Sequence, residues 1–251
     1  VDGVSVTDLD PASGLPVAGT TTRLTLPAIP RALGGGSSFS GPILAVGPSG
    51  DTLVAWSSSG IITVATRPPA GAWQRPVRVS SPGAQTYSVR VAAGPDGRAA
   101  VTWVAVGRVP RPGRPGYRSK IAWASLRAPG GAWEKPVRLS GPDQIVSAPE
   151  VSLDGQGRAS AFWALGTNGI SGRASTVQSA DRGPRGTTWS PTGALSSAGL
   201  GPLFPRVATN GDGDAAVVWS RCTTRTQATV EVATRGAGDS DWSQVTRLAA
   251  P

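Results

Sequence analysis

The sequence predicts an all-β protein in which one short antiparallel sheet recurs four times, like the four-stranded blades of a β-propeller. Three observations predict it: tryptophan recurs at a fixed distance after glycine, the apolar runs are short, and turn residues separate them. The 251 residues include 34 Gly and 23 Pro. These stand between the apolar runs, where tight turns need them, so we expect an ordered fold that is rich in turns.

The first half of each repeat is an apolar run, a glycine-containing turn and a second run that ends in tryptophan. The glycine stands six positions before the tryptophan in all four copies, which are Gly50/Trp56, Gly97/Trp103, Gly157/Trp163 and Gly213/Trp219. Because a buried indole removes about 150–250 Å² from water, we expect these tryptophans to fill the contacts between neighbouring sheets.

The second half of each repeat has a third strand with an arginine near its end, a turn with another tryptophan, and a short fourth strand. These pairs are Arg67/Trp73, Arg127/Trp133, Arg182/Trp189 and Arg235/Trp242. Four short runs in a repeat favour up-and-down antiparallel pairing with tight turns. The repeats cover approximately residues 41–84, 85–144, 145–200 and 201–251.

Residues 1–40 lie outside the repeats and are expected to be irregular. Residues 34–38, Gly-Gly-Gly-Ser-Ser, are typical of a flexible connector. Residues 20–26 are expected to form a strand that either closes the ring by completing a blade at the other end or belongs to a missing blade. Four blades is at the low end for propellers, so a larger ring, completed by further sequence or by oligomerisation, remains an alternative.

The composition excludes several classes of function. The net charge is +9, but only Lys120 and Lys135 are lysines and the arginines are spread along the chain. A nucleic-acid site would predict a clustered basic stripe, so no nucleic-acid partner is expected. The chain has no His, which excludes Ser-His-Asp and Cys-His catalysis and a His-ligated metal site. Its single cysteine, Cys222, excludes an internal disulfide and is expected to be a small buried residue or the partner of a Cys outside this segment.

The sequence also bears on location. No apolar stretch approaches the ~20 residues that span a bilayer, so no transmembrane segment is expected. The sequence contains no signal-peptide pattern and starts at Val1 without Met, so we expect a mature or excised segment. The high content of Gly, Ala, Pro, Ser and Thr favours an extracellular or cell-surface protein.

The turns that carry the second tryptophan resemble the Asp-box (BNR) repeats of sialidase-like β-propellers. In that family Ser-x-Asp-x-Gly-x-Thr-Trp lies between the third and fourth strands of a blade. The third repeat comes nearest, with Ser179, Asp181, Gly183, Thr188 and Trp189 and extra residues between Gly and Thr. The other repeats keep only part of it: Gly71 and Trp73, Gly131 and Trp133, and Asp239, Asp241 and Trp242. The resemblance implies a β-propeller fold over residues 41–250.

The resemblance also sets out what sialidase chemistry would require. Catalysis in that family uses an arginine triad, a tyrosine with its glutamate, and an aspartate, and the Asp-box is a folding element away from the catalytic centre. Here the tyrosines are Tyr87 and Tyr117, and the glutamates are Glu134, Glu150 and Glu231. No Phe-Arg-Ile-Pro motif occurs. The resemblance therefore does not carry sialidase activity to this chain.

Candidate binding residues come from where the repeats differ. Loops between second and third strands vary in length and lie on the same face as the links between blades, where binding residues of a rigid scaffold concentrate. The longest, residues 107–120, carries Arg108, Arg111, Arg114, Tyr117, Arg118 and Lys120. These suit an anionic ligand such as an acidic glycan; the alternative is a solvated, Pro-rich excursion.

Three further features complete the candidate sites. Tyr87 is added as a possible ligand contact on the same face, and Glu150 precedes a first strand and is expected to face the central channel. A glycosidase would need a second carboxylate near Glu150. Asn210, Asp212 and Asp214 place oxygens at alternate positions, as Ca²⁺ loops do, but the other repeats lack this spacing. A plain turn is favoured there, and no cofactor is predicted.

Three functions are compatible with these observations. The leading one is a non-catalytic extracellular recognition module that binds a glycan or a protein through the loop-rich face. The second is a carbohydrate-active enzyme, sialidase-like or another glycoside hydrolase, that uses carboxylates in the central channel. The third is a structural spacer within a larger surface protein.

Overall fold

The computed structural model describes residues 3–8, 10, 12–13, 15–25, 40–81, 85–111, 114–166, 174–200, 202–222 and 227–248. The fold is all-β, as predicted, and all but one of the strand pairs are antiparallel. Among the described residues the one helical turn is the 3-10 turn η1 (Pro95–Gly97). Within the described ranges no helix has the length and apolar character needed to cross a membrane.

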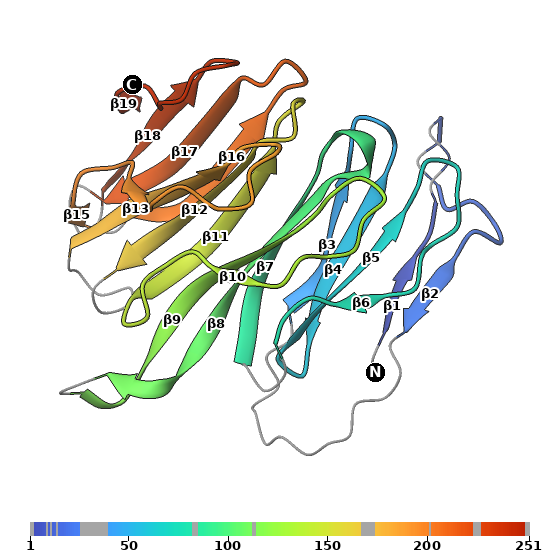
Figure 1. Cartoon of the computed structure of the whole chain (residues 1–251), viewed down its shortest axis with the longest axis horizontal. Coiled ribbons are helices and arrows are strands. Elements are labelled where there is room, and N and C mark those ends of the chain that lie inside the picture. The colour runs from blue at the N-terminus through green and yellow to red at the C-terminus, as the bar shows by residue number, and fades with distance from the viewer. Residues whose placement is uncertain are drawn as a thin grey trace.

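Four groups of four strands, named sheets I to IV, pair in chain order within each group (Figure 1). One parallel pair, Ile145 with Lys120, joins sheets II and III into a single nine-stranded sheet. Sheet I has β3 (Ser40–Val46), β4 (Thr52–Ser58), β5 (Ile61–Arg67) and β6 (Val77–Arg78). Sheet II has β7 (Gln85–Ala93), β8 (Ala99–Arg111), β9 (Arg114–Arg127) and β10 (Val137–Arg138). Sheet III has β11 (Ile145–Leu153), β12 (Ala159–Gly166), β13 (Ala174–Arg182) and β14 (Gly193–Ala194), with β15 (Gly199–Leu200) also on β13. Sheet IV has β16 (Pro202–Thr209), β17 (Ala215–Cys222), β18 (Ala228–Arg235) and β19 (Thr246–Leu248).

The glycine that recurs before each second strand has a conformational reason. Gly50, Gly97, Gly157 and Gly213 have φ of 85°, 72°, 83° and 105°. A side chain is disfavoured at positive φ, whereas glycine adopts it freely. The turn between first and second strands therefore requires glycine in every sheet.

The sheets lie side by side in a row that begins with the hairpin of β1 (Gly3–Val6) and β2 (Thr22–Thr25) and ends with sheet IV (Figure 1). Each second-strand tryptophan is at most 2% exposed and packs against the element before its own sheet. These tryptophans are Trp56 against the hairpin, Trp103 against sheet I, Trp163 against sheet II and Trp219 against sheet III. The apolar core is thus a series of layers between sheets.

The third-strand arginines join each sheet to the element that precedes it. The four contacts are Arg67 to Asp8 (2.8 Å), Arg127 to Gln74 (3.2 Å), Arg182 to Glu134 (2.6 and 2.8 Å) and Arg235 to Asp181 (2.7 Å). A planar guanidinium offers several donors in a fixed geometry. At least these four arginines therefore hold neighbouring layers together, which accounts for part of the high arginine content.

The structure bears on the expectations for two segments. Residues 22–25 form β2, in the segment where a strand is expected; among the described residues it pairs with β1 and not with sheet IV, which leaves the alternative of a missing blade. Residues 107–120 do not form a loop, because β8 runs to Arg111 and β9 starts at Arg114, so both strands extend beyond the sheet as a hairpin arm. Cross-strand hydrogen bonding continues through the Pro- and Arg-rich sequence.

Sheet IV has one covered face. Along β17, buried residues alternate with half-buried ones, and the buried residues Val217 and Trp219 face sheet III. In β4 and β12, six successive residues are buried, so both faces of those strands are covered. The outward face of sheet IV, formed by Ala216, Val218, Val230 and Val232, stays partly exposed.

Candidate functional site

The first strand of each sheet carries a bulge at one equivalent level. The register shifts between Ser40 and Ile43, Tyr87 and Arg90, Ser147 and Glu150, and Leu203 and Arg206. In three sheets the bulge residue has positive φ without being glycine: Ser88 at 54°, Ala148 at 46° and Phe204 at 57°. Such a conformation costs of order 1–3 kcal/mol, and bulges of this kind redirect the side chains beside them.

The residues that follow these bulges form a charged cluster across sheets II, III and IV. Arg90 Nε donates a hydrogen bond to Glu150 Oε1 at 2.9 Å, and Arg206 Nη1 donates to the same oxygen. The side chains of Arg90, Glu150 and Arg206 are 29%, 11% and 55% exposed. A nearly buried carboxylate is thus shared by two guanidinium groups that reach solvent. We call these three residues the Arg–Glu–Arg cluster.

The cluster has a net positive charge and unused donors. Arg90 Nη1 donates to the carbonyl of Val89 and Arg206 Nη1 to the carbonyl of Pro205. Within the part of the chain that the structure describes, Nη2 of both arginines and Nε of Arg206 have no acceptor. Guanidinium donors of this kind suit the oxygens of a carboxylate or sulfate group.

From sequence, Glu150 is expected to precede a first strand and to face the central channel, whereas in the structure it lies within the first strand of sheet III. The partners that the structure gives it are two arginines. Two-carboxylate glycoside hydrolysis needs a second acid about 5–10 Å from the first. Both arginines bind the same oxygen of Glu150, and guanidinium donors that reach solvent beside it suit an anion.

Two more of the predicted residues lie together at the base of the arm. Lys120 Nζ lies 5.8 Å from the centroid of the Tyr87 ring, which packs between sheets II and III. The hydroxyl of Tyr87 is buried and has no hydrogen-bond partner within the described residues. Burial raises the pKa of Tyr87 to about 12. The first strand places it near the arm, because Gln85 of β7 pairs with Val106 of β8.

The arm itself carries the other predicted residues. Arg118 is exposed and pairs with Pro110 across the two strands, and Arg111 pairs with Arg114. The side chains of Arg108, Arg111, Arg114 and Tyr117 lie outside the described part of the structure. Their roles as ligand contacts therefore stay predictions.

We expect replacement of Tyr87 by phenylalanine to change stability at alkaline pH. The unfolded chain loses the tyrosine proton near the usual pKa of 10.0, whereas the folded chain keeps it to about 12. Ionisation of Tyr87 therefore costs the fold nothing below pH 10, and the free energy of unfolding falls as the pH rises from 10 toward 12. In urea unfolding at several pH values, the free energy of unfolding should fall less between pH 10 and 12 for Tyr87→Phe than for wild type. The same fall with pH in both proteins would contradict this. At pH 7 the variant should be as stable as wild type or more so, because an unpaired buried hydroxyl is removed.

Comparison with solved structures places the fold among known proteins. A protein of unknown function from Dyadobacter fermentans is 12% identical with a TM-score of 0.56, over 84% of this chain and 69% of that one. A PL25 ulvan lyase, a polysaccharide lyase bound to -[GlcA(1-4)Rha3S]-, is 10% identical with a TM-score of 0.53, over 83% of this chain and 55% of the lyase. A mutant of the sialidase NanB from Streptococcus pneumoniae is 10% identical with a TM-score of 0.50, over 86% of this chain and 53% of the sialidase. No family model and no curated protein sequence matches.

The fold of the chain is similar to that of β-propeller proteins that include a sialidase and a polysaccharide lyase. The chain spans about half of the length of each of these two proteins.

Asn210, Asp212 and Asp214, whose spacing in the sequence resembles that of a Ca²⁺ loop, lie in the turn between β16 and β17. Asn210 Oδ1 accepts hydrogen bonds from the backbone N–H of Gly213 and Asp214, and its amide donates to Asp214 Oδ2 at 2.9 Å. The pKa of Asp214 is lowered by the hydrogen bond that its carboxylate accepts from the Asn210 amide and, second, by the one that it accepts from the N–H of Ala237. Asp212 contributes its backbone carbonyl, which accepts a long 3.5 Å bond from Gln156. Within the described ranges no three metal-binding side chains gather.

Sequence reasoning missed the two arginines of the cluster. Arg90 and Arg206 lie 60 and 56 residues from Glu150 in the sequence. Their contacts with Glu150 therefore depend on how sheets II, III and IV pack against one another. A signal was present in the sequence. When the four first strands are aligned, the residue after the bulge is charged in sheets II, III and IV. The aligned residues are Ile43, Arg90, Glu150 and Arg206.

Proposed function

We propose that this chain is a four-bladed portion of an extracellular β-propeller that binds an anionic glycan without chemical conversion. The Arg–Glu–Arg cluster carries the proposal. Arg90 and Arg206 bind the carboxylate or sulfate of the ligand, and Glu150 is a positioning residue that holds both guanidinium groups. The hairpin arm extends the binding surface with Arg118 and Lys120.

Two observations support a glycan as the ligand. The ulvan lyase with the same fold is bound to a glycan that contains glucuronate and a sulfated rhamnose. Among the described residues the side-chain partners of Glu150 are the two arginines and no second carboxylate, which fits recognition better than hydrolysis. The strained residues Ser88, Ala148 and Phe204 flank the cluster, and strain of this kind concentrates at functional sites.

Replacement of Arg206 by glutamine tests the proposal. Because a hydrogen bond to a charged group contributes about 1.5–3 kcal/mol, the affinity for a uronate or sulfated oligosaccharide should fall about tenfold or more in titration calorimetry. Arg23→Gln makes the same charge change on β2, outside the cluster, and should leave the affinity within about twofold.

The outcomes separate the proposed function from its alternatives. Equal losses in Arg206→Gln and Arg23→Gln would indicate a general charge effect and contradict a site at the cluster. Failure of the wild-type chain to bind any anionic glycan would overturn the proposal and leave protein recognition or a spacer role. Cleavage of the oligosaccharide would overturn its non-catalytic part.

A further inference from the structure

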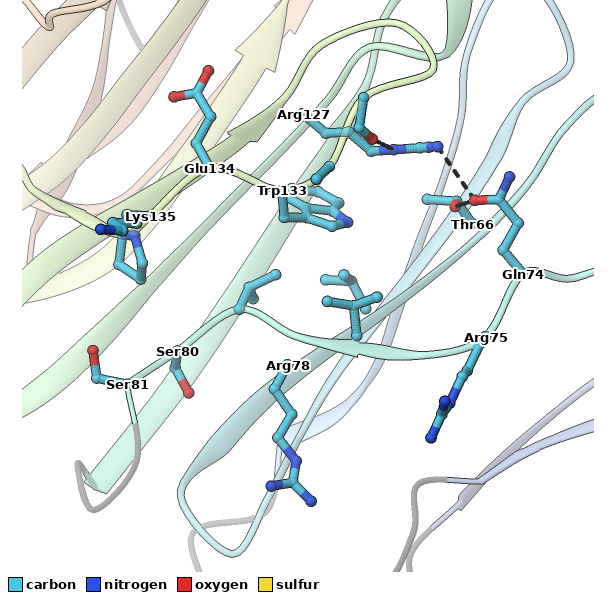
Figure 2. A pocket seen from close by; sticks show the side chains of 16 residues that line it. Thr66, Gln74, Arg75, Arg78, Ser80, Ser81, Arg127, Trp133, Glu134 and Lys135 are labelled. Atoms are coloured by element: carbon cyan, nitrogen blue, oxygen red, sulfur yellow. Dashed lines mark hydrogen bonds between the residues drawn. The ribbon is translucent and has the colours of Figure 1, made fainter.

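A groove runs between sheets I and II. It is formed by β5 and β6 of sheet I and by the segment between β9 and β10 of sheet II, away from the first strands. It has a volume of about 410 Å³. Figure 2 shows Trp133 in its centre, with Gln74 and Arg127 at one end and Lys135 at the other. Arg75 and Arg78 line its edge on the side of β6, and in Figure 2 their exposed side chains extend away from Trp133. We call this the outer groove.

The outer groove is open because two residues differ from those of the next layer. Between sheets II and III, Thr192 donates a hydrogen bond to the carbonyl of Leu139 at 2.9 Å, and Arg182 binds both oxygens of Glu134. The strand registers place Pro136 where sheet III has Thr192. Proline has no hydroxyl, so it cannot form the equivalent bond to the backbone of sheet I.

The second difference lies at the end of the groove. Gln74 occupies the position of Glu134, relative to the tryptophan before it. Arg127 makes one bond of 3.2 Å to Gln74, in place of the two bonds between Arg182 and Glu134. Gln74 Oε1 also accepts from Thr66 at 2.7 Å. One strong ionic contact is therefore missing from this layer.

The lining chemistry suits an anionic sugar. Trp133 is half-buried and presents part of its indole to the groove, and an indole offers a flat apolar surface for a ligand ring. Arg75, Arg78 and Lys135 have no carboxylate partner among the described residues. The carboxylate of Glu134 is occupied on both oxygens by Arg182. The free charge in the outer groove is thus entirely positive.

A smaller hollow continues the outer groove toward the base of the arm. Its volume is about 220 Å³, and it shares Ser80, Ser81 and Pro136 with the groove. Trp123 lines it, and the indole N–H of Trp123 is buried without a hydrogen-bond partner within the described part of the chain. Buried polar groups are normally hydrogen-bonded. The indole N–H of Trp123 would therefore donate a hydrogen bond to a hydroxyl oxygen of a ligand in this hollow.

We propose that the outer groove binds a sugar unit that carries a carboxylate or a sulfate, as a second site separate from the Arg–Glu–Arg cluster. The indole of Trp133 packs on the sugar ring and Lys135 binds its anionic group, and the exposed side chains of Arg75 and Arg78 turn toward the groove to bind it as well. The class of ligand rests on the proposed function, whereas the position of the site rests on the groove itself. A long polyanionic glycan that reached both sites would bind with avidity.

The test follows the indole N–H resonance of Trp133 by NMR while uronate and sulfated hexasaccharides are added separately, with a neutral glucan hexasaccharide as reference. The resonance should shift with at least one anionic probe and not with the neutral one. Arg78→Gln should weaken this binding about tenfold. Arg138→Gln, the same change at the equivalent position of sheet II but outside the groove, should alter it less than twofold.

A second variant closes the groove without removing a charge. Pro136→Thr supplies the hydroxyl that Thr192 provides in sheet III, so binding at Trp133 should weaken while the melting temperature is kept or raised. Binding unchanged in Arg78→Gln, or a Trp133 resonance that never moves, overturns the inference.

Arg206→Gln separates the two sites. If it abolishes glycan binding while Trp133 never responds, the cluster stands and the groove is refuted. If Trp133 responds fully in Arg206→Gln and no other binding is lost, the groove stands and the cluster is refuted.

Discussion

Replacing Trp163 with alanine is expected to lower the free energy of unfolding by about 3–5 kcal/mol. Its side chain is fully buried between sheets II and III, where it packs with Val104, Ala122 and Leu139. Both sheets have neighbours on their other faces, so the layer cannot easily collapse around the lost indole. Guanidinium unfolding followed by far-UV circular dichroism measures the change.

Trp163→Phe is the matched control, because it keeps an aromatic ring in the same layer and should lose clearly less stability. A loss below about 1 kcal/mol for Trp163→Ala, or equal losses for both variants, would contradict the packing described here.

Replacing Glu231 with alanine should be equally damaging, by about 3–5 kcal/mol. Glu231 Oε2 accepts hydrogen bonds from Trp219 Nε1 at 2.8 Å and from Arg221 Nε at 2.7 Å, and both charged side chains are 7% exposed. Without the carboxylate, the guanidinium of Arg221 is buried with only the carbonyl of Ser197 as a partner among the described residues. Thermal unfolding should show a large fall in melting temperature.

The double variant Arg221→Met with Glu231→Leu distinguishes an uncompensated charge from a loss of packing. Replacing both members of a buried ion pair with apolar residues is often nearly neutral. The double variant should therefore be more stable than Glu231→Ala alone. A double variant that is less stable than the single one would show that the ion pair itself holds the sheet together.

The all-β class and the turn glycines could be predicted because they depend on local sequence. The offset between Gly50 and Trp56 reflects a positive φ and a buried indole, and both recur in every sheet. The arm could not be predicted in the same way. Proline and glycine at residues 110–116 are typical of a loop. Pairing between β8 and β9 nevertheless continues into this segment, with two register shifts, as far as Arg111 and Arg114.

Contacts between sheets could not be predicted, because each joins residues of different repeats. The third-strand arginines recur visibly, but their partners Asp8, Gln74, Glu134 and Asp181 share no residue type. Glu150 could be placed on a first strand, whereas Arg90 and Arg206 became its partners only through the stacking of three sheets.

The partly exposed face of sheet IV has a consequence for how the molecule unfolds. In a linear array each sheet is stabilised by its own pairing and by its immediate neighbours. Sheets II and III have two such neighbours, whereas sheet IV has one on the described part of the chain. Local opening therefore requires the least free energy at that end, and the amides of β18 and β19 exchange with solvent before those of β8 and β12.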